Sequence, residues 1–178
     1  MSLVRKFITT KFTCTTLRAA NRMVHRECDQ SIELAKRVSE ELAARPTRVE
    51  SMLGVDEDMR DWSLFQILEH NTIVNHEMTQ RIDYLVRDEV LISDFDPKKD
   101  VMPSAKPGPE QIEKFGNSVD QHLTLIHSFD ENLRETKRAP HPVFGMMNAH
   151  QWHCMFGFHL MLHRKQMEAI VAALEKST

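Results

Sequence analysis

The chain has 178 residues, a length typical of one domain, so we expect residues 1–178 to form a single domain that buries a substantial core. Apolar residues make up 41% and charged residues 28%, the balance of an ordinary globular protein. The net charge of −3 argues against a nucleic-acid partner or an anionic membrane surface, and no apolar run approaches the roughly 20 residues of a membrane span.

The cysteine and histidine content bears on the cellular compartment and on the kind of site. The three cysteines, Cys14, Cys28 and Cys154, are odd in number and form no CxxC pair. This argues against a disulfide framework and indicates a reducing compartment, so we expect a cytoplasmic protein. Ten histidines is a large number for this length and is the first indication of a metal.

The N-terminal segment is basic. The first 26 residues carry six Lys or Arg and no acidic residue, a composition also found in organelle transit peptides. We expect instead an ordered, basic N-terminal arm over residues 1–15, ahead of the first long helix.

Four stretches with a 3.6-residue apolar period follow this arm. The first predicts a helix from about 17 to 44 that ends before Pro46. The second begins near Ser63, where Ser63 and Gln66 predict a capping box, and continues to about Arg87.

A long connection separates the second helix from the third. Residues 88–108 hold three prolines and end on Gly108, which is too long a stretch for a simple hairpin, so we expect the two helices to run parallel through a crossover. The third helix is predicted to open at Pro109, with an apolar stripe that reaches Leu133. The fourth is predicted from Asn148 as N-cap to about Leu174.

These elements together predict the fold class. No segment shows the alternation of a β-strand, and the four long helices are amphipathic. We expect an all-α protein, a four-helix bundle with long connections and an extra N-terminal arm.

Two histidines lie four residues apart in the predicted fourth helix. At 100° per residue, His159 and His163 fall in the middle of its apolar face, with the basic residues opposite. This spacing brings two side chains to neighbouring positions, as in helical zinc sites. Because a buried polar group costs free energy without a partner, the pair predicts either a metal or hydrogen-bonding partners in the core.

A third histidine lies at the flank of the second helix's buried stripe. A bundle interior can bring His70, beside Ile67 and Val74, toward the pair on the fourth helix. Three neutral imidazoles then hold one divalent ion and leave a position for water or substrate, as in catalytic sites. We expect zinc or nickel, with iron and manganese as alternatives that the same ligands accept. The competing interpretation is three ordinary core histidines.

Other groups receive weaker assignments. Glu77 lies two turns beyond His70 and is either a general base or hydrogen-bond partner of the site, or a solvated glutamate. His122 points inward and is expected in the core or behind a ligand. His150 is expected near the mouth of the site with His153, and Cys154 off the buried face. The histidines predicted to be solvated are His25, His76, His127 and His153.

Patterns of other metal and nucleophile chemistries are missing. The segment HEMTQ at 76–80 lacks the second histidine of a zincin, and no Glu-x-x-His pair supports a ferritin-like di-iron centre. The sequence has no CxxCH for covalent haem, no Gly-rich phosphate loop and no GxSxG.

Two segments resemble a known family. DWSLFQILEHNTIVN is similar to the second-helix motif of the DinB/YfiT-like superfamily, and HPVFGMMNAHQWHCMFGFHLMLHRKQ resembles its last-helix region, where an HPxFG turn precedes H-x-x-x-H. The specific resemblance covers about residues 61–86 and 141–170. It implies a four-helix bundle whose metal ligands are His70, His159 and His163. The basic N-terminal arm departs from the family's usual pattern.

The resemblance also implies a class of activity. Family members of known activity include enzymes that use a divalent metal with a low-molecular-weight thiol such as bacillithiol or mycothiol, and homodimers are common. It therefore implies a metal-dependent thiol transferase or hydrolase acting on a small-molecule substrate. The alternative is a non-catalytic, dimeric bundle with a structural or adventitious metal. Direct DNA binding is a third interpretation, and only the basic arm offers it any support.

Overall fold

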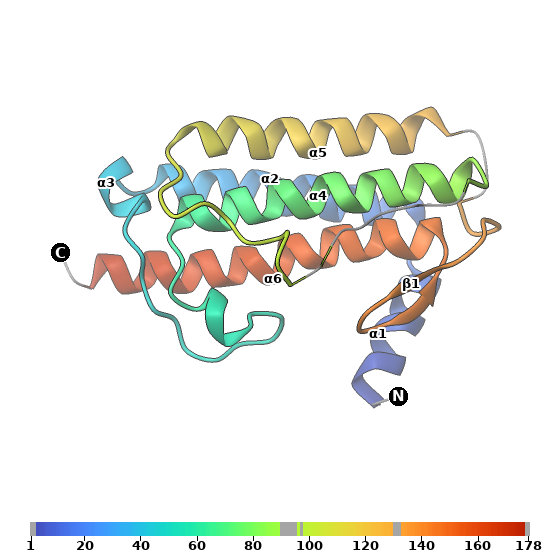
Figure 1. Ribbon diagram of the computed structural model, residues 1–178, viewed down its shortest axis with the longest axis horizontal. Helices are drawn as coiled ribbons and strands as arrows, with labels where there is room; N and C mark the ends of the chain where they lie inside the picture. Colours follow the sequence, from blue (N-terminus) through green and yellow to red (C-terminus); the bar gives the residue numbers. More distant parts are fainter. Residues whose placement is uncertain (1–2, 90–95, 97, 130–132, 177–178) are drawn as a thin grey trace.

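A bundle of four long helices dominates the protein, which we describe from a computed structural model covering residues 3–89, 96, 98–129 and 133–176 (Figure 1). The long helices are α2 (Leu17–Lys36), α4 (Leu64–Val86), α5 (Glu110–Ser128) and α6 (Ala149–Glu175). The shorter elements are α1 (Leu3–Cys14), α3 (Glu40–Ala43), the 3-10 turn Glu57–Met59, β1 (Ala139–His141) and β2 (Gly145–Met147). The predicted all-α class is confirmed.

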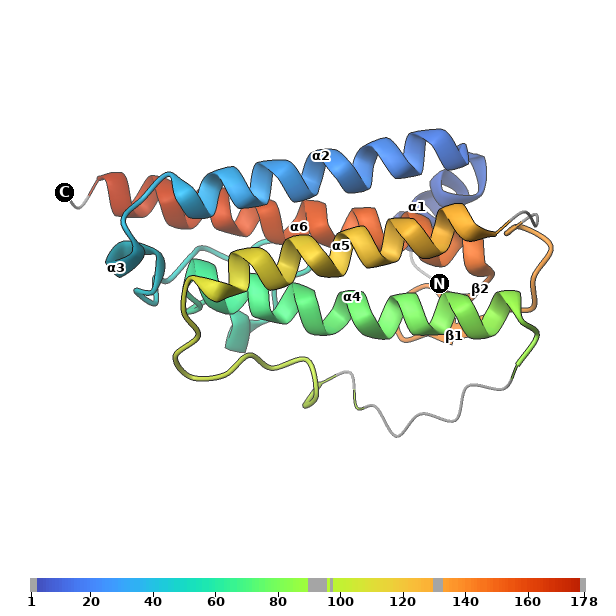
Figure 2. The same ribbon diagram turned by 90° about the horizontal axis from the view of Figure 1, so that it is seen from above.

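The helices of the bundle run in two parallel pairs. Helices α4 and α5 run in one direction, and α2 and α6 run in the opposite direction (Figure 1 and Figure 2). Around the bundle, α2 packs on α6, α6 on α4, α4 on α5 and α5 on α2. The predicted crossover between α4 and α5 is therefore confirmed, although residues 90–95 and 97 of this connection lie outside the described ranges. The antiparallel pair α4 and α6 is the one that carries the predicted site histidines.

Side-chain caps set where the long helices begin. The Ser63 side chain accepts the Gln66 N–H while the Gln66 side chain accepts the Ser63 N–H, so the predicted capping box is present at α4. Asn148 and Gln151 form the same reciprocal pair at the start of α6. Thr16 accepts the Ala19 N–H and starts α2.

Two predicted helix ends were wrong. The helix predicted over 17–44 is broken, because α2 ends at Lys36 and the Ser39 side chain accepts the Leu42 N–H to begin α3. Serine bonds locally to the backbone and so competes with a continuing helix. Helix α5 ends at Ser128, and Leu133 is buried beyond it.

The prediction that no segment forms a strand was wrong at one hairpin. In β1 and β2, Ala139 pairs with Met147 and His141 with Gly145. Gly145 has φ of +77°, a left-handed conformation that favours glycine. Strands of three residues are too short to show alternation in a sequence. The ring of Phe144 anchors this hairpin 5.7 Å from the ring of Phe12 on α1.

The N-terminal arm is a helix that is held against the start of α6. His150 Nε2–H donates to the Thr15 carbonyl over 2.8 Å, and Gln151 donates to the Thr13 hydroxyl over 3.0 Å. Arg134 donates to the Thr15 carbonyl over 2.6 Å. His150 is thus a structural contact of the arm, and the expectation that it lines the mouth of the site was wrong. In the ranges described, no helix is long and apolar enough to span a membrane.

Helix α6 is covered on more sides than its amphipathic pattern indicates. His153 and Cys154 are both buried, so the expectations that they lie off the buried face were wrong. Cys154 is covered by α1, where its Sγ lies 3.6 Å from the Phe12 carbonyl. His153 is covered by α2 and α5, through Asn21 and His122. The histidines His25, His76 and His127 are exposed as predicted.

Candidate metal centre

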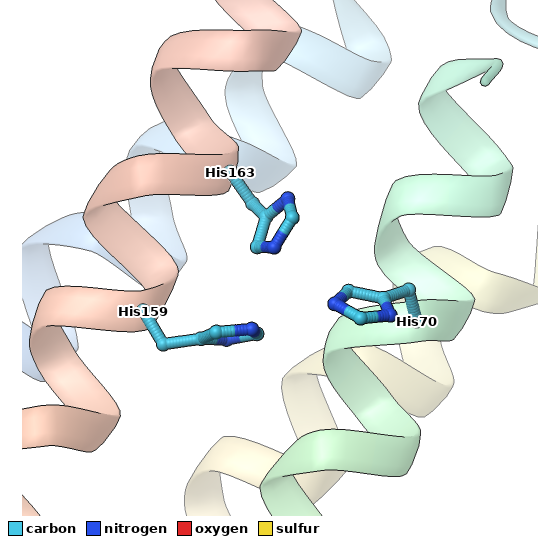
Figure 3. Close-up of side chains that lie close together, drawn as sticks. All are labelled: His70, His159 and His163. Atoms are coloured by element: carbon cyan, nitrogen blue, oxygen red, sulfur yellow. The ribbon is translucent and has the colours of Figure 1, made fainter. Parts of the chain in front are cut away.

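Three imidazole rings from two antiparallel helices converge inside the bundle. His70 extends from α4 toward His159 and His163, which lie one turn apart on α6 (Figure 3). One ring nitrogen of each histidine lies within 4.8 Å of those of the other two. Ligand nitrogens that share an ion at about 2.1 Å stand about 3–4 Å apart, so small ring rotations bring this group to coordination distance.

The proton of His70 is placed by the long connection between α4 and α5. Nδ1–H of His70 donates to the Val101 carbonyl over 2.7 Å. The lone pair of the neutral ring is therefore on Nε2, which is buried and has no hydrogen-bond partner among the described residues. The indole of Trp62 packs against the same ring, 5.0 Å between centroids. His70 thus presents an oriented, unused lone pair.

A two-step hydrogen-bond chain orients His163 in the same way. The amide nitrogen of Gln166 donates to the Met59 carbonyl over 2.7 Å, which fixes the direction of this amide. Its oxygen therefore faces His163 and accepts Nδ1–H over 2.9 Å. The Nε2 atom of His163 is left with the lone pair. Such an acceptor behind a ligating histidine fixes the tautomer and increases the basicity of the ligand.

His159 completes the group. Its Nδ1 atom is buried, and within the described part of the chain it has no hydrogen-bond partner. Its ring lies 4.6 Å from that of His163 and 5.3 Å from that of His70, measured between centroids. Most buried polar atoms in proteins find a partner, so two orphaned nitrogens in one cluster need an explanation.

The electrostatics keep all three rings neutral at pH 7. Burial lowers the pKa of His70 to about 4. Burial, followed by repulsion from His70, lowers the pKa of His163 to about 3. Burial and then the neighbouring His163 and His70 hold the pKa of His159 well below its ordinary value. Neutral imidazole is the form that binds a metal.

The other candidate residues do not join this group. Glu77 accepts from Arg81 over 2.5 Å, and its role in the site stays a prediction. His122 Nε2 and His153 Nδ1 share a hydrogen bond of 2.9 Å. His122 Nδ1 also forms a hydrogen bond of 2.9 Å with the Thr79 hydroxyl. His122 and His153 therefore form a separate buried pair in the core.

Several partners of the site were missed by the sequence reasoning. The carbonyls of Val101 and Met59 have no sequence signal, because every residue carries one and only the folded connections bring these two to the histidines. Gln166 follows His163 by three residues, a helical neighbour spacing that could have indicated the contact.

A comparison with protein families decides where this chain belongs. The family model of the DinB superfamily matches residues 23–167. The chain belongs to the DinB superfamily. The predicted resemblance is thus confirmed, and the matched range contains all three histidines and leaves the whole N-terminal arm outside. Among curated proteins, no match to this DinB-superfamily chain was found. Family membership and the three-histidine group both fit a metal-binding protein.

Proposed function

We propose that His70, His159 and His163 bind one divalent metal ion in a site that works on a small-molecule substrate. The observation that carries this proposal is the pair of buried, unpartnered nitrogens, His70 Nε2 and His159 Nδ1, beside a His163 whose tautomer is already set. A cation at the centre of the group satisfies their lone pairs without a protein donor. Zinc and nickel are the ions proposed first, and iron and manganese accept the same ligands.

The proposed reaction is thiol transfer or hydrolysis. A bound divalent ion lowers the pKa of a coordinated water toward about 7 and deprotonates a coordinated thiol. Three protein ligands leave room for that group. The chain's own part is to hold the imidazoles neutral, through burial, and to fix their orientation through Val101 and Gln166. A low-molecular-weight thiol as co-substrate, a homodimer and a cytoplasmic location belong to the same proposal.

A non-catalytic bundle is the competing function. In that case the three histidines brace the helix interface and bind metal by accident. The orphaned nitrogens favour the metal site, because histidines that only brace a core normally have both ring nitrogens bonded or solvated.

Metal analysis of freshly purified protein tests the proposal. We expect about one equivalent of a transition metal in the wild type and almost none in His163→Ala, because two imidazoles remain where three bound the ion. His76→Ala, which removes an exposed histidine from the same helix as His70, is the matched control and should keep the metal. Circular dichroism checks that all three proteins are folded. Equal metal content in wild type and His163→Ala would refute the site.

Turnover separates the two functions. If metal is stoichiometric, rates with model electrophiles are measured with and without a small thiol. A rate that needs both metal and thiol supports transfer, a rate that needs metal and water alone supports hydrolysis, and a full complement of metal without any rate favours the non-catalytic bundle.

A further inference from the structure

A second group of polar side chains follows the histidines along the interface of α4 and α6. Arg81 comes eleven residues after His70, and Trp152 seven residues before His159. Both separations are close to whole helical turns, so each residue shares a helix face with its histidine. Because the helices are antiparallel, both lie on the same side of the histidine group (Figure 1). They meet there, with the guanidinium carbon of Arg81 5.0 Å from the centroid of the Trp152 ring.

Two buried donors in this second group have no acceptor. The Nε atom of Arg81 and the Nε1 atom of Trp152 are buried, and neither has a hydrogen-bond partner in the described ranges. Trp152 is only 4% exposed. The Nη2 edge of the guanidinium is used by Glu77, which therefore holds Arg81 in place. A buried N–H group without an acceptor costs free energy, so both donors point to an acceptor that is not part of the described protein.

The hairpin contributes a third donor beside them. His141 Nδ1 accepts the N–H groups of Val143 over 3.0 Å and Phe144 over 3.3 Å. The hydrogen of the neutral ring is therefore on Nε2. Its ring lies 5.1 Å from that of Trp152. Burial, followed by the charge of Arg81, lowers the pKa of His141 to about 4, so the ring is neutral at pH 7.

We propose that Arg81, Trp152 and His141 bind a carboxylate of the substrate. Three N–H donors from three elements, one of them cationic, match the oxygens of a carboxylate. Two helical turns separate Trp152 from His159, about 10 Å at 1.5 Å per residue. The substrate is therefore a small acid whose reacting group lies about 10 Å from its carboxylate. The assignment to a substrate rests on the proposed function, whereas the binding of the carboxylate is tested without metal.

NMR titration of the metal-free protein tests this carboxylate site. The indole N–H signal of Trp152, assigned by its loss in Trp152→Phe, is followed while glutarate or glutaramide is added. We expect a saturable shift with glutarate and an affinity at least about ten-fold lower for glutaramide, which has the same skeleton without charge. In Arg81→Gln the glutarate affinity should fall about ten-fold or more.

Arg87→Gln is the matched control. Like Arg81, Arg87 pairs with a carboxylate one turn earlier on α4, but it is exposed, so its loss should leave glutarate binding unchanged. Equal affinities for glutarate and glutaramide, no saturable shift, or no effect of Arg81→Gln would each overturn the inference. A protein that binds glutarate selectively but purifies without metal would contradict the proposed function and leave the carboxylate site intact. A protein that purifies with metal but binds glutarate and glutaramide equally would contradict the carboxylate site and leave the proposed function intact.

Discussion

At the scale of single residues, Gln166 acts on the candidate site without touching an ion. Its oxygen accepts Nδ1–H of His163, and its nitrogen is tied to the Met59 carbonyl. In Gln166→Leu, a change of similar size, His163 Nδ1–H loses its acceptor and the ring is free to turn. We expect metal affinity to fall about 10- to 100-fold, the usual effect of losing a partner behind a ligand. Competition with a chromophoric chelator measures it.

The control for Gln166 is Gln66→Leu, since Gln66 lies in the capping box of α4 and its described hydrogen bonds go to Ser63 and Ser104. That variant is expected to lose stability without losing metal affinity. Unchanged affinity in a folded Gln166→Leu protein would mean that the tautomer of His163 is set by something else.

The position of a site residue was predictable only where helical periodicity places it on a buried face. His159 and His163 followed from helical periodicity, and His70 from its place on the flank of a second buried stripe. The contacts of His70 with Val101 and of Gln166 with Met59 depend on where irregular connections fold back, and periodicity carries no information about that. His153 was misplaced because the pattern of α6 alone does not show that α2 and α5 also cover this part of the helix, where His153 bonds Asn21 and His122.

At the scale of the helices, one buried ion pair joins α2 to α6. Glu27 is fully buried and accepts from Arg164, whose side chain is 13% exposed. Removing Arg164 leaves the buried Glu27 carboxylate with Arg26, whose side chain is 60% exposed, as its remaining cationic partner in the described ranges. We therefore expect Arg164→Leu to lower the free energy of unfolding by about 3 kcal/mol, the lower end of the range for breaking a buried pair. Urea denaturation followed by circular dichroism measures this loss.

Arg26 provides the comparison for this pair. It also bonds Glu27 but is 60% exposed, so Arg26→Leu should cost less than about 1 kcal/mol. If both variants lose the same stability, the exposed arginine is as important as the buried one and the burial argument fails.

The long elements were predictable and the short ones were not. The capping box at Ser63 and the N-cap at Asn148 predicted the starts of α4 and α6, because the residues of such motifs are local in sequence. The break after Lys36 and the hairpin of β1 and β2 involve only three or four residues each. A periodicity argument needs several turns of helix or several residues of strand, so it cannot resolve elements of that length.

At the scale of the whole molecule, the bundle and its crossover were predictable from four amphipathic segments and one connection too long for a hairpin. The path of the N-terminal arm was not, because His150 contacts the Thr15 carbonyl, a group that every residue carries, and the Thr13 hydroxyl is one of several in the arm. The single-domain assignment of residues 1–178 stays a prediction.

The number of buried histidines makes the stability of the metal-free protein depend on pH. Burial lowers the pKa to about 4 for His70 and His141 and to about 3 for His153 and His163. Below pH 6.5, the ordinary value, the unfolded chain binds protons that the folded chain does not, so stability is complete above this pH and is lost as the pH falls toward 4. Each such ring lowers the free energy of unfolding by about 1.4 kcal/mol for every pH unit below 6.5. Because a domain is stable by only about 5–15 kcal/mol, we expect acid unfolding above pH 4.

Urea midpoints at pH 7.5, 6 and 5 measure how steeply the stability falls with pH. His153→Gln should reduce this slope and His76→Gln, at an exposed position, should not. A midpoint that stays constant from pH 7.5 to 5 would show that these rings take up protons without unfolding the bundle.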